Sequence, residues 1–226
     1  MAESSIIEGI VIKTVPFQDN KKVITLFTEE GILGLITTVN EKKPASFLLA
    51  TPLSIGEYIY QNSKGNLKKL IDGTVYQSYL HFNQSLCLLE AASVCLKGIL
   101  ISQLETKPSK ALYQLTKVYL QKMPTCKEPL KLATSFHLKV LKHEGLFSIE
   151  SFCYYCNKKK ASGFFDKLPC CDCINHPKKI FFSDLEWDIL KVLFFSTQFH
   201  LIEGIECPEN LSRKVIGLFE SFYLEN

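Results

Sequence analysis

The fold is decided by residues 6–76, where five short β-type runs follow one another: IIEGIVIKT (6–14), KVITLF (22–27), ILGLITTV (32–39), LSIGEYIY (53–60) and LKKLIDGTVY (67–76). Each run is rich in β-branched, aliphatic or aromatic residues and is bounded by turn residues, which is typical of β-strands. Gly31 and the segment 63–66 supply the flexible backbone that short hairpins need. The runs predict a small barrel, with an open antiparallel meander as the alternative.

The sequence after residue 76 changes to helical spacing. Pro108 and Pro129 stand where the first turn of a helix tolerates a missing N–H, and Gly145 is a candidate C-cap. Helices are expected over residues 80–100, 108–122, 128–144, 183–196 and 208–224. We therefore predict an α+β protein with a strand domain at 1–76 and a helical domain at 77–226.

Two cysteine pairs interrupt the helical half at residues 153–173. The four residues share the CxxC spacing by which two turns present sulfurs to zinc: Cys153, Cys156, Cys170 and Cys173. Four thiolates close the coordination shell of Zn²⁺, so we predict a structural site rather than a catalytic one. Cys171 or His176 offers an alternative ligand, and four reduced thiols without metal are the remaining alternative.

The bulk composition is that of an ordinary globular protein, with 46% hydrophobic and 22% charged residues in a chain of 226. The longest apolar stretch, residues 85–104, contains Glu90 and Lys97, so we expect neither membrane insertion nor secretion. Tight cysteine pairs indicate metal binding in a reducing compartment, and we expect a cytoplasmic protein.

Catalytic motifs are not evident in the sequence. The five histidines stand in no nucleophile, His-Glu-x-x-His or phosphate-loop context, so we expect no enzyme and no nucleotide cofactor. A zinc deaminase is an alternative, because Cys126-x-Glu128 and Pro169-Cys170-x-x-Cys173 match its pattern. That reading leaves the first cysteine pair unexplained. The isolated Cys87, Cys95, Cys126 and Cys207 are interpreted as small core or surface residues.

The opening residues 7–14, continued by 23–28 and Gly31, resemble the N-terminus of the bacterial RecO recombination-repair family. Residues 136–146, leading to the first cysteine pair, and the closing segment 215–224 are also similar to that family. The resemblance implies an OB-fold barrel followed by a helical domain that carries the zinc loop. It also implies a bacterial, nucleoid-associated protein that binds single- and double-stranded DNA and anneals strands coated by single-strand-binding protein. With RecR, such a protein would help to load RecA.

Lysines on or between the barrel strands are the candidate phosphate contacts: Lys13, Lys21, Lys22, Lys42, Lys43, Lys68 and Lys69. Tyr58 and Tyr60 are candidates for base stacking, although packing inside the fold is the preferred interpretation. Only Arg213 is an arginine, which argues against sequence-specific reading of bases.

The distribution of charge along the sequence argues against the barrel as the only DNA-binding surface. Residues 1–75 hold eight Lys against eight acidic residues, whereas residues 76–150 hold nine Lys against five. A shared surface would include lysines of this middle third: Lys107, Lys110, Lys117, Lys131, Lys139 and Lys142. The alternative function is a protein-interaction adaptor with incidental DNA contact.

Overall fold

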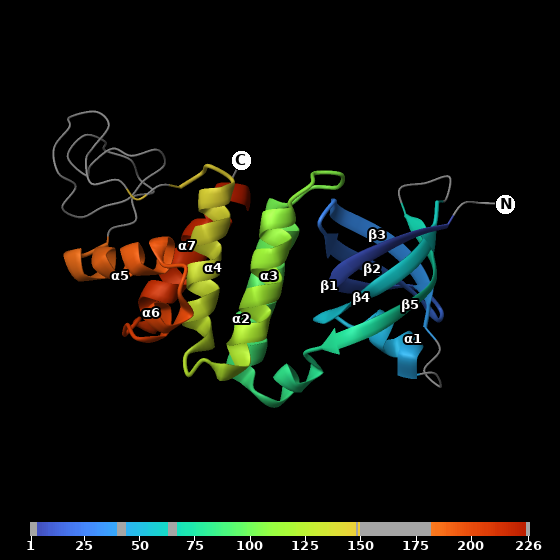
Figure 1. Cartoon of the computed structure of the whole chain (residues 1–226), viewed down its shortest axis with the longest axis horizontal. Coiled ribbons are helices and arrows are strands. Elements are labelled where there is room, and N and C mark those ends of the chain that lie inside the picture. The colour runs from blue at the N-terminus through green and yellow to red at the C-terminus, as the bar shows by residue number, and fades with distance from the viewer. Residues whose placement is uncertain (1–3, 40–43, 63–66, 148, 150–181, 225–226) are drawn as a thin grey trace. The chain divides into compact units, whose positions relative to one another are not determined.

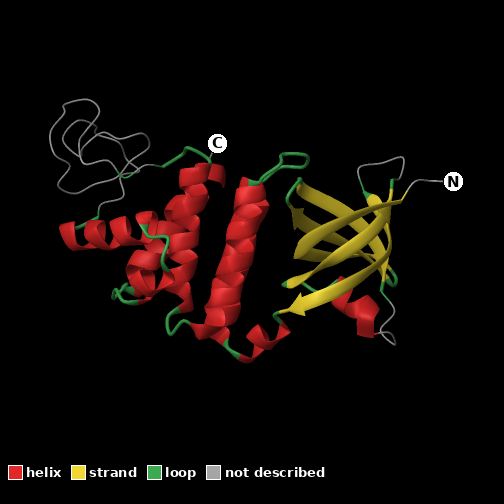
Figure 2. Cartoon of the chain, in the orientation of Figure 1, coloured by secondary structure: helices red, strands yellow, loops and turns green. Residues whose placement is uncertain are grey.

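The structure is a computed structural model that describes residues 4–39, 44–62, 67–147, 149 and 182–224 (Figure 1). The chain forms two compact units, Met1–Leu120 and Gln121–Asn226. Every strand in the described part of the chain belongs to the first unit, and the second is helical there (Figure 2).

Five strands close into a barrel in the first unit. They are β1 (Ser4–Gln18), β2 (Lys21–Thr28), β3 (Gly31–Thr38), β4 (Ser54–Gln61) and β5 (Lys68–Ser78). Their order around the barrel is β1-β2-β3-β5-β4, and only the β3–β5 pair is parallel. The predicted α+β layout, an OB-fold-type barrel followed by helices, is confirmed, and the open meander is wrong.

The first strand is long because it pairs with two neighbours. Its residues 4–10 pair with β4 and its residues 9–18 pair with β2. The register shifts after Val11 and again after Pro16, and such bulges bend a strand so that it can close a barrel. Pro16 ends the predicted run near Thr14, but the bulge accommodates its missing N–H and the strand continues to Gln18.

The barrel interior is filled by alternate residues of the strands, as a period-two pattern requires. A short helix, α1 (Pro44–Leu49), lies between β3 and β4 in the sequence and contributes Leu49, with the adjacent Ala50, to the interior cluster. The other members of this cluster are Val11, Ile24, Leu26, Leu35, Val39, Tyr58, Tyr60 and Leu70. This packing fixes which residues of each strand face solvent.

The predicted hairpin between β2 and β3 is confirmed at Gly31, whose φ is +109°. The Thr28 hydroxyl donates to the Gly31 carbonyl at 2.9 Å and accepts from the Glu30 amide at 3.1 Å. A Cβ at Gly31 would lie 2.8 Å from the Lys107 carbonyl oxygen. Glycine is therefore required here both by the backbone angle and by the available space.

Two long helices follow the barrel, α2 (Leu86–Ser102) and α3 (Lys110–Lys122), after a 3-10 turn, η1 (Leu80–Gln84). The single helix predicted over 80–100 is wrong, because Ser85 separates η1 from α2. Its hydroxyl accepts from the Leu88 amide at 3.5 Å and caps α2. Serine at an N-cap satisfies amides that a helix start leaves without partners.

The second unit is built around α4 (Pro129–His143), which is buried along most of its length. Its other elements are η2 (Met123–Thr125), α5 (Asp184–Phe195), α6 (Phe199–Glu203) and α7 (Glu209–Leu224). Gly145 has a φ of +69° directly after the C-cap of α4, which confirms the predicted helix end. Ser183 and Glu186 form the predicted capping box of α5.

A membrane span requires a helix of sufficient length and hydropathy. None of the helices among the described residues is both long enough and apolar enough to cross a membrane.

The domain boundary predicted after residue 76 separates strands from helices, whereas the compact units divide at residue 120. The boundary after residue 76 stays a prediction.

Candidate nucleic-acid interface

Four of the predicted lysines flank the third strand of the barrel. Lys21 and Lys22 of β2 lie opposite Thr38 and Thr37 of β3. On its other side, β3 pairs with β5, where Lys68 lies opposite Leu35 and Lys69 opposite Ile36. Since neighbouring strands are about 5 Å apart and residues rise about 3.4 Å along a strand, the four Cα atoms fit within roughly 15 Å. We call Lys21, Lys22, Lys68 and Lys69 the β3 lysine cluster.

The two pairs within the β3 lysine cluster are held differently. Lys22 and Lys68 are partly buried, and their ammonium groups lie over aromatic rings. The Lys22 Nζ is 5.8 Å from the centroid of Phe47, and the Lys68 Nζ is 4.9 Å from that of Tyr60. These cation–π contacts orient two of the charges. Lys21 and Lys69 are exposed, so their charges can reach an anion without unpacking the barrel.

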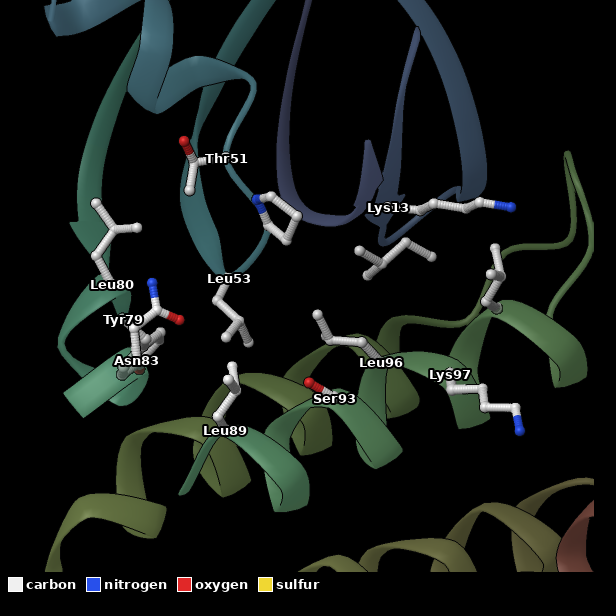
Figure 3. A pocket seen from close by; sticks show the side chains of 13 residues that line it. Lys13, Thr51, Leu53, Tyr79, Leu80, Asn83, Leu89, Ser93, Leu96 and Lys97 are labelled. Carbon is white, nitrogen blue, oxygen red and sulfur yellow. The ribbon is translucent and has the colours of Figure 1, made fainter. Parts of the chain in front are cut away.

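Lys13 lies apart from the β3 lysine cluster. It is exposed on β1 opposite Thr25 and lines a groove of about 500 Å³ whose walls include residues of α2. Figure 3 shows Lys13 on the barrel and Lys97 on α2 at the same end of this groove, with apolar side chains such as Leu53, Leu89 and Leu96 along it. The predicted contacts Lys42 and Lys43 lie outside the described residues.

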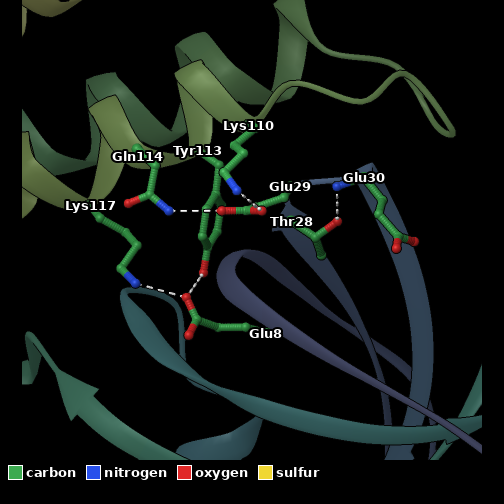
Figure 4. A network of polar contacts seen from close by, with 8 residues as sticks. All are labelled: Glu8, Thr28, Glu29, Glu30, Lys110, Tyr113, Gln114 and Lys117. Atoms are coloured by element: carbon green, nitrogen blue, oxygen red, sulfur yellow. Dashed lines mark hydrogen bonds and ion pairs between the residues drawn. The ribbon is translucent and has the colours of Figure 1, made fainter.

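A polar network attaches α3 to the barrel (Figure 4). The Glu8 carboxylate accepts from the Tyr113 hydroxyl at 2.6 Å and from the Lys117 ammonium at 2.7 Å. Partial burial raises the pKa of Glu8, but hydrogen bonds from Lys117, Tyr113 and Tyr76 outweigh burial and lower the pKa to about 2. Glu8 therefore stays ionised across the physiological range and neutralises Lys117.

The second branch of this network uses Glu29. Its carboxylate accepts from Gln114 Nε2 at 2.8 Å and lies 3.5 Å from the Lys110 ammonium. Two lysines of residues 76–150, Lys110 and Lys117, are thus paired with acidic residues of the barrel. These ion pairs neutralise part of the excess positive charge of residues 76–150.

Two more middle-third lysines serve the second unit. Lys131 is 3% exposed and donates to the carbonyls of Glu203 at 2.9 Å and Ile205 at 2.6 Å. Lys139 donates to the Ser196 carbonyl at 2.6 Å, after the last turn of α5. These ammonium groups satisfy carbonyls that helix ends leave without partners. The expectation that Lys131 lies on a DNA-binding surface is therefore wrong.

The tyrosines proposed for stacking lie in the barrel interior. Tyr58 is 0% exposed and Tyr60 is 8% exposed, so the preferred packing interpretation is confirmed. Burial raises the pKa of Tyr58, and its hydroxyl has no hydrogen-bond partner among the described residues. The exposed barrel aromatics include Phe17 and Phe47. Strand alternation in the sequence could not place Phe17, because this residue lies at the second register shift of β1.

The cysteines outside the two CxxC pairs agree with their interpretation. Cys95 and Cys126 are buried, Cys87 is exposed and Cys207 is partly exposed, and all four are free. Within the described ranges, no three His, Cys, Asp or Glu side chains are arranged to hold a metal. The predicted zinc ligands Cys153, Cys156, Cys170 and Cys173 lie outside those ranges, so the zinc site stays a prediction.

The closed five-stranded barrel, followed by helices, defines an OB-fold-type protein. The β3 lysine cluster gives this barrel one local group of positive charges. Two family models match it: Recombination protein O N terminal over residues 1–79 and Recombination protein O C terminal over residues 89–225. The chain belongs to the recombination protein O (RecO) family. Membership supports a role in DNA repair and recombination.

Curated relatives carry the same family name. DNA repair protein RecO of Chlamydia pneumoniae is 27% identical over 223 residues, which cover 97% of this chain and 88% of the relative. DNA repair protein RecO of Clostridium perfringens is 30% identical over 157 residues, which cover 67% of this chain and 62% of the relative. Among solved structures, asparaginyl-tRNA synthetase of Entamoeba histolytica matches with a TM-score of 0.31 and 11% identity, covering 73% of this chain and 37% of the synthetase.

Proposed function

We propose that this protein is a recombination mediator that binds single- and double-stranded DNA and anneals complementary strands. With RecR, it helps to load RecA onto strands coated by single-strand-binding protein. Family membership supports the general role. The β3 lysine cluster is the observation that carries DNA binding, because its four lysines lie on the two strands that flank one strand of an OB-fold-type barrel.

The chemistry of annealing suits this arrangement. A protein that anneals strands must hold a flexible polyanion while leaving the base edges available for pairing, and lysine contacts to phosphate do this. An ammonium on a flexible stem acts as a point charge without the fixed fork of arginine. All seven predicted lysines remain candidates, and the exposed Lys21 and Lys69 are the first to test.

The proposal is tested by annealing of complementary oligonucleotides precoated with single-strand-binding protein, without nucleotide, across a salt series. The wild-type protein should accelerate annealing, and the effect should fade as salt rises. In parallel binding measurements, Lys21→Glu or Lys69→Glu should each lower the slope of log affinity against log salt by about 0.7 for single strands. Lys127→Glu makes the same charge change at an exposed position of the second unit and should leave the slope unchanged.

A folded protein that fails to accelerate annealing at any salt concentration would contradict the proposal. Equal slopes for wild type, Lys21→Glu and Lys69→Glu would remove the β3 lysine cluster from it and leave annealing to another surface.

We also propose that Cys153, Cys156, Cys170 and Cys173 bind one structural Zn²⁺. The support is their spacing, two CxxC pairs separated by thirteen residues. Metal analysis should find about one zinc per chain, and Cys153→Ser with Cys170→Ser should release it and lower thermal stability. Cys87→Ser removes an exposed free thiol of α2 and is the matched control. Unchanged zinc content in the double variant would contradict the site.

A second candidate function, the protein-interaction adaptor, is favoured by the groove at Lys13. Its lining is mainly apolar, and its volume of about 500 Å³ is that of a small-ligand or side-chain pocket. An adaptor would bind DNA with a shallow salt dependence, because few phosphates would be contacted. The salt series therefore discriminates between the two functions.

A further inference from the structure

Two phenylalanines beside the β3 lysine cluster expose their rings to solvent. Phe17, near the end of β1, is 50% exposed, and Phe47 of α1 is 45% exposed. Single exposed apolar side chains are common on protein surfaces and need no explanation alone. These two differ because the Phe47 ring lies near the ammonium of Lys22 and Phe17 follows the residue of β1 that pairs with Lys22.

Lys22 is the residue that links them. Its backbone pairs with Pro16, the neighbour of Phe17, and Gln18 on the other side of Phe17 pairs with Lys21. The Lys22 ammonium lies 5.8 Å from the centroid of the Phe47 ring. The Phe47 ring therefore has a lysine of the cluster beside it, and the backbone of Phe17 lies between the residues that pair with Lys22 and Lys21.

Contacts at the start of α1 hold Phe47 near this end of β3. The Ser46 hydroxyl donates to the Thr38 carbonyl at 3.4 Å, and Thr38 pairs with Lys21. The Val39 amide donates to the Asn20 carbonyl at 2.8 Å, which ties the β1–β2 turn to the same end of β3. The turn after Phe17 and the helix of Phe47 are thus both fixed to one strand.

Exposed flat rings on the same barrel end as a group of lysines fit a ligand that is anionic along its backbone and carries flat rings. A single strand of nucleic acid has this chemistry, because its phosphates bind lysines and its unpaired bases stack on aromatic side chains. In a duplex the base faces are already covered by neighbouring bases, so the rings would contribute little. Tyr58 and Tyr60 cannot take this role because they are buried.

We propose that Phe17 and Phe47 form a stacking platform for unpaired bases of a single strand whose phosphates lie against Lys21 and Lys22. The inference deepens the proposed function and rests on it. It makes the barrel favour single strands over duplexes, although lysines alone bind both.

The test compares three DNA ligands with the full-length protein by fluorescence anisotropy. They are oligothymidylate, an abasic oligodeoxyribose phosphate of equal length, and a duplex. Phe17→Ala and Phe47→Ala should each weaken binding of oligothymidylate by about fivefold or more, since stacking on one aromatic is worth that much. Their binding to the abasic strand and the duplex should change less than about twofold, while Lys21→Glu weakens all three.

Two controls separate stacking from folding. Leu86→Ala truncates an apolar side chain that is 81% exposed at the start of α2 and should change none of the three affinities. Phe17→Tyr and Phe47→Tyr keep an aromatic ring and should retain wild-type binding to oligothymidylate.

The outcomes are distinguishable. Wild-type protein that binds oligothymidylate no more tightly than the abasic strand would overturn the stacking platform and leave phosphate binding intact. Equal losses on all three ligands in the alanine variants would also overturn it. A folded wild-type protein that binds none of the three would refute the proposed function itself.

Discussion

The attachment of α3 to the barrel can be tested by replacing one carboxylate. Glu8→Ala removes the acceptor of the Tyr113 hydroxyl and the ion-pair partner of Lys117. Tyr113 is 1% exposed. Leaving a buried hydroxyl without an acceptor costs about 1–3 kcal/mol. The partly exposed ion pair adds at most about 1 kcal/mol. We expect a local loss of about 2 kcal/mol.

Hydrogen exchange measured by mass spectrometry reports this loss directly. A decrease of about 2 kcal/mol in local stability corresponds to a roughly thirtyfold faster exchange of the α3 amides, residues 110–122. Glu30→Ala removes an exposed acid of the β2–β3 hairpin and is the matched control. The amides of α4, in the second unit, are the internal reference. Exchange in α3 that is equal in Glu8→Ala and Glu30→Ala would refute the reasoning.

The same network predicts a dependence on pH. The folded pKa of Glu8, about 2, lies below its ordinary value of 4.5. The ionised carboxylate therefore contributes stability that is present above about pH 4.5 and is lost as the pH falls towards 2. Because the side chain is 43% exposed, we discount the contribution for solvent screening to about 1 kcal/mol. The stability difference between wild type and Glu8→Gln should shrink across this range, and a constant difference would contradict the assignment.

Substitutions at four further positions test local features of the fold. Ser183→Ala removes the capping box of α5 and should cost about 1 kcal/mol in thermal unfolding, whereas Ser183→Asp should restore most of it. Gly31→Ala should destabilise the hairpin by more than about 1 kcal/mol, because φ is +109° and the Cβ would lie 2.8 Å from the Lys107 carbonyl. Gly217→Ala places the same methyl group in open space within α7 and should instead stabilise by about 0.5–1 kcal/mol. Lys131→Met leaves two carbonyls near the end of α6 without their donor and should lower the free energy of unfolding by about 2 kcal/mol.

Local chemistry made much of the fold predictable from the sequence. The five strands, the β2–β3 hairpin, the end of α4 at Gly145 and the capping box of α5 each depend on residues within a few positions of one another. Elements of five or six residues, such as α1 and α6, were missed. They are too short to show a helical period.

The candidate site depended on information that the sequence does not display. The β3 lysine cluster forms because Lys22 is paired with Thr37 and Lys68 with Leu35, and strand register at this range is set by barrel closure. The pairing of Lys117 with Glu8 has the same origin, since the two residues are 109 positions apart. The net positive charge of residues 76–150 therefore overstated how many of their lysines are available to bind a partner.

The shared pairing of β1 also has a consequence for the growing chain. The meander from β1 to β3 is local, and it can form once residue 38 has left the ribosome. The edge of β1 that pairs with β4 then has no partner until β4 is synthesised. The edge of β3 that pairs with β5 has no partner until β5 is synthesised, and the last residue of β5 is Ser78. At a synthesis rate of about 5–20 residues per second, this interval lasts roughly 2–8 s. During that time two strand edges have no partner, so we expect nascent chains of this length to be the form most prone to intermolecular pairing.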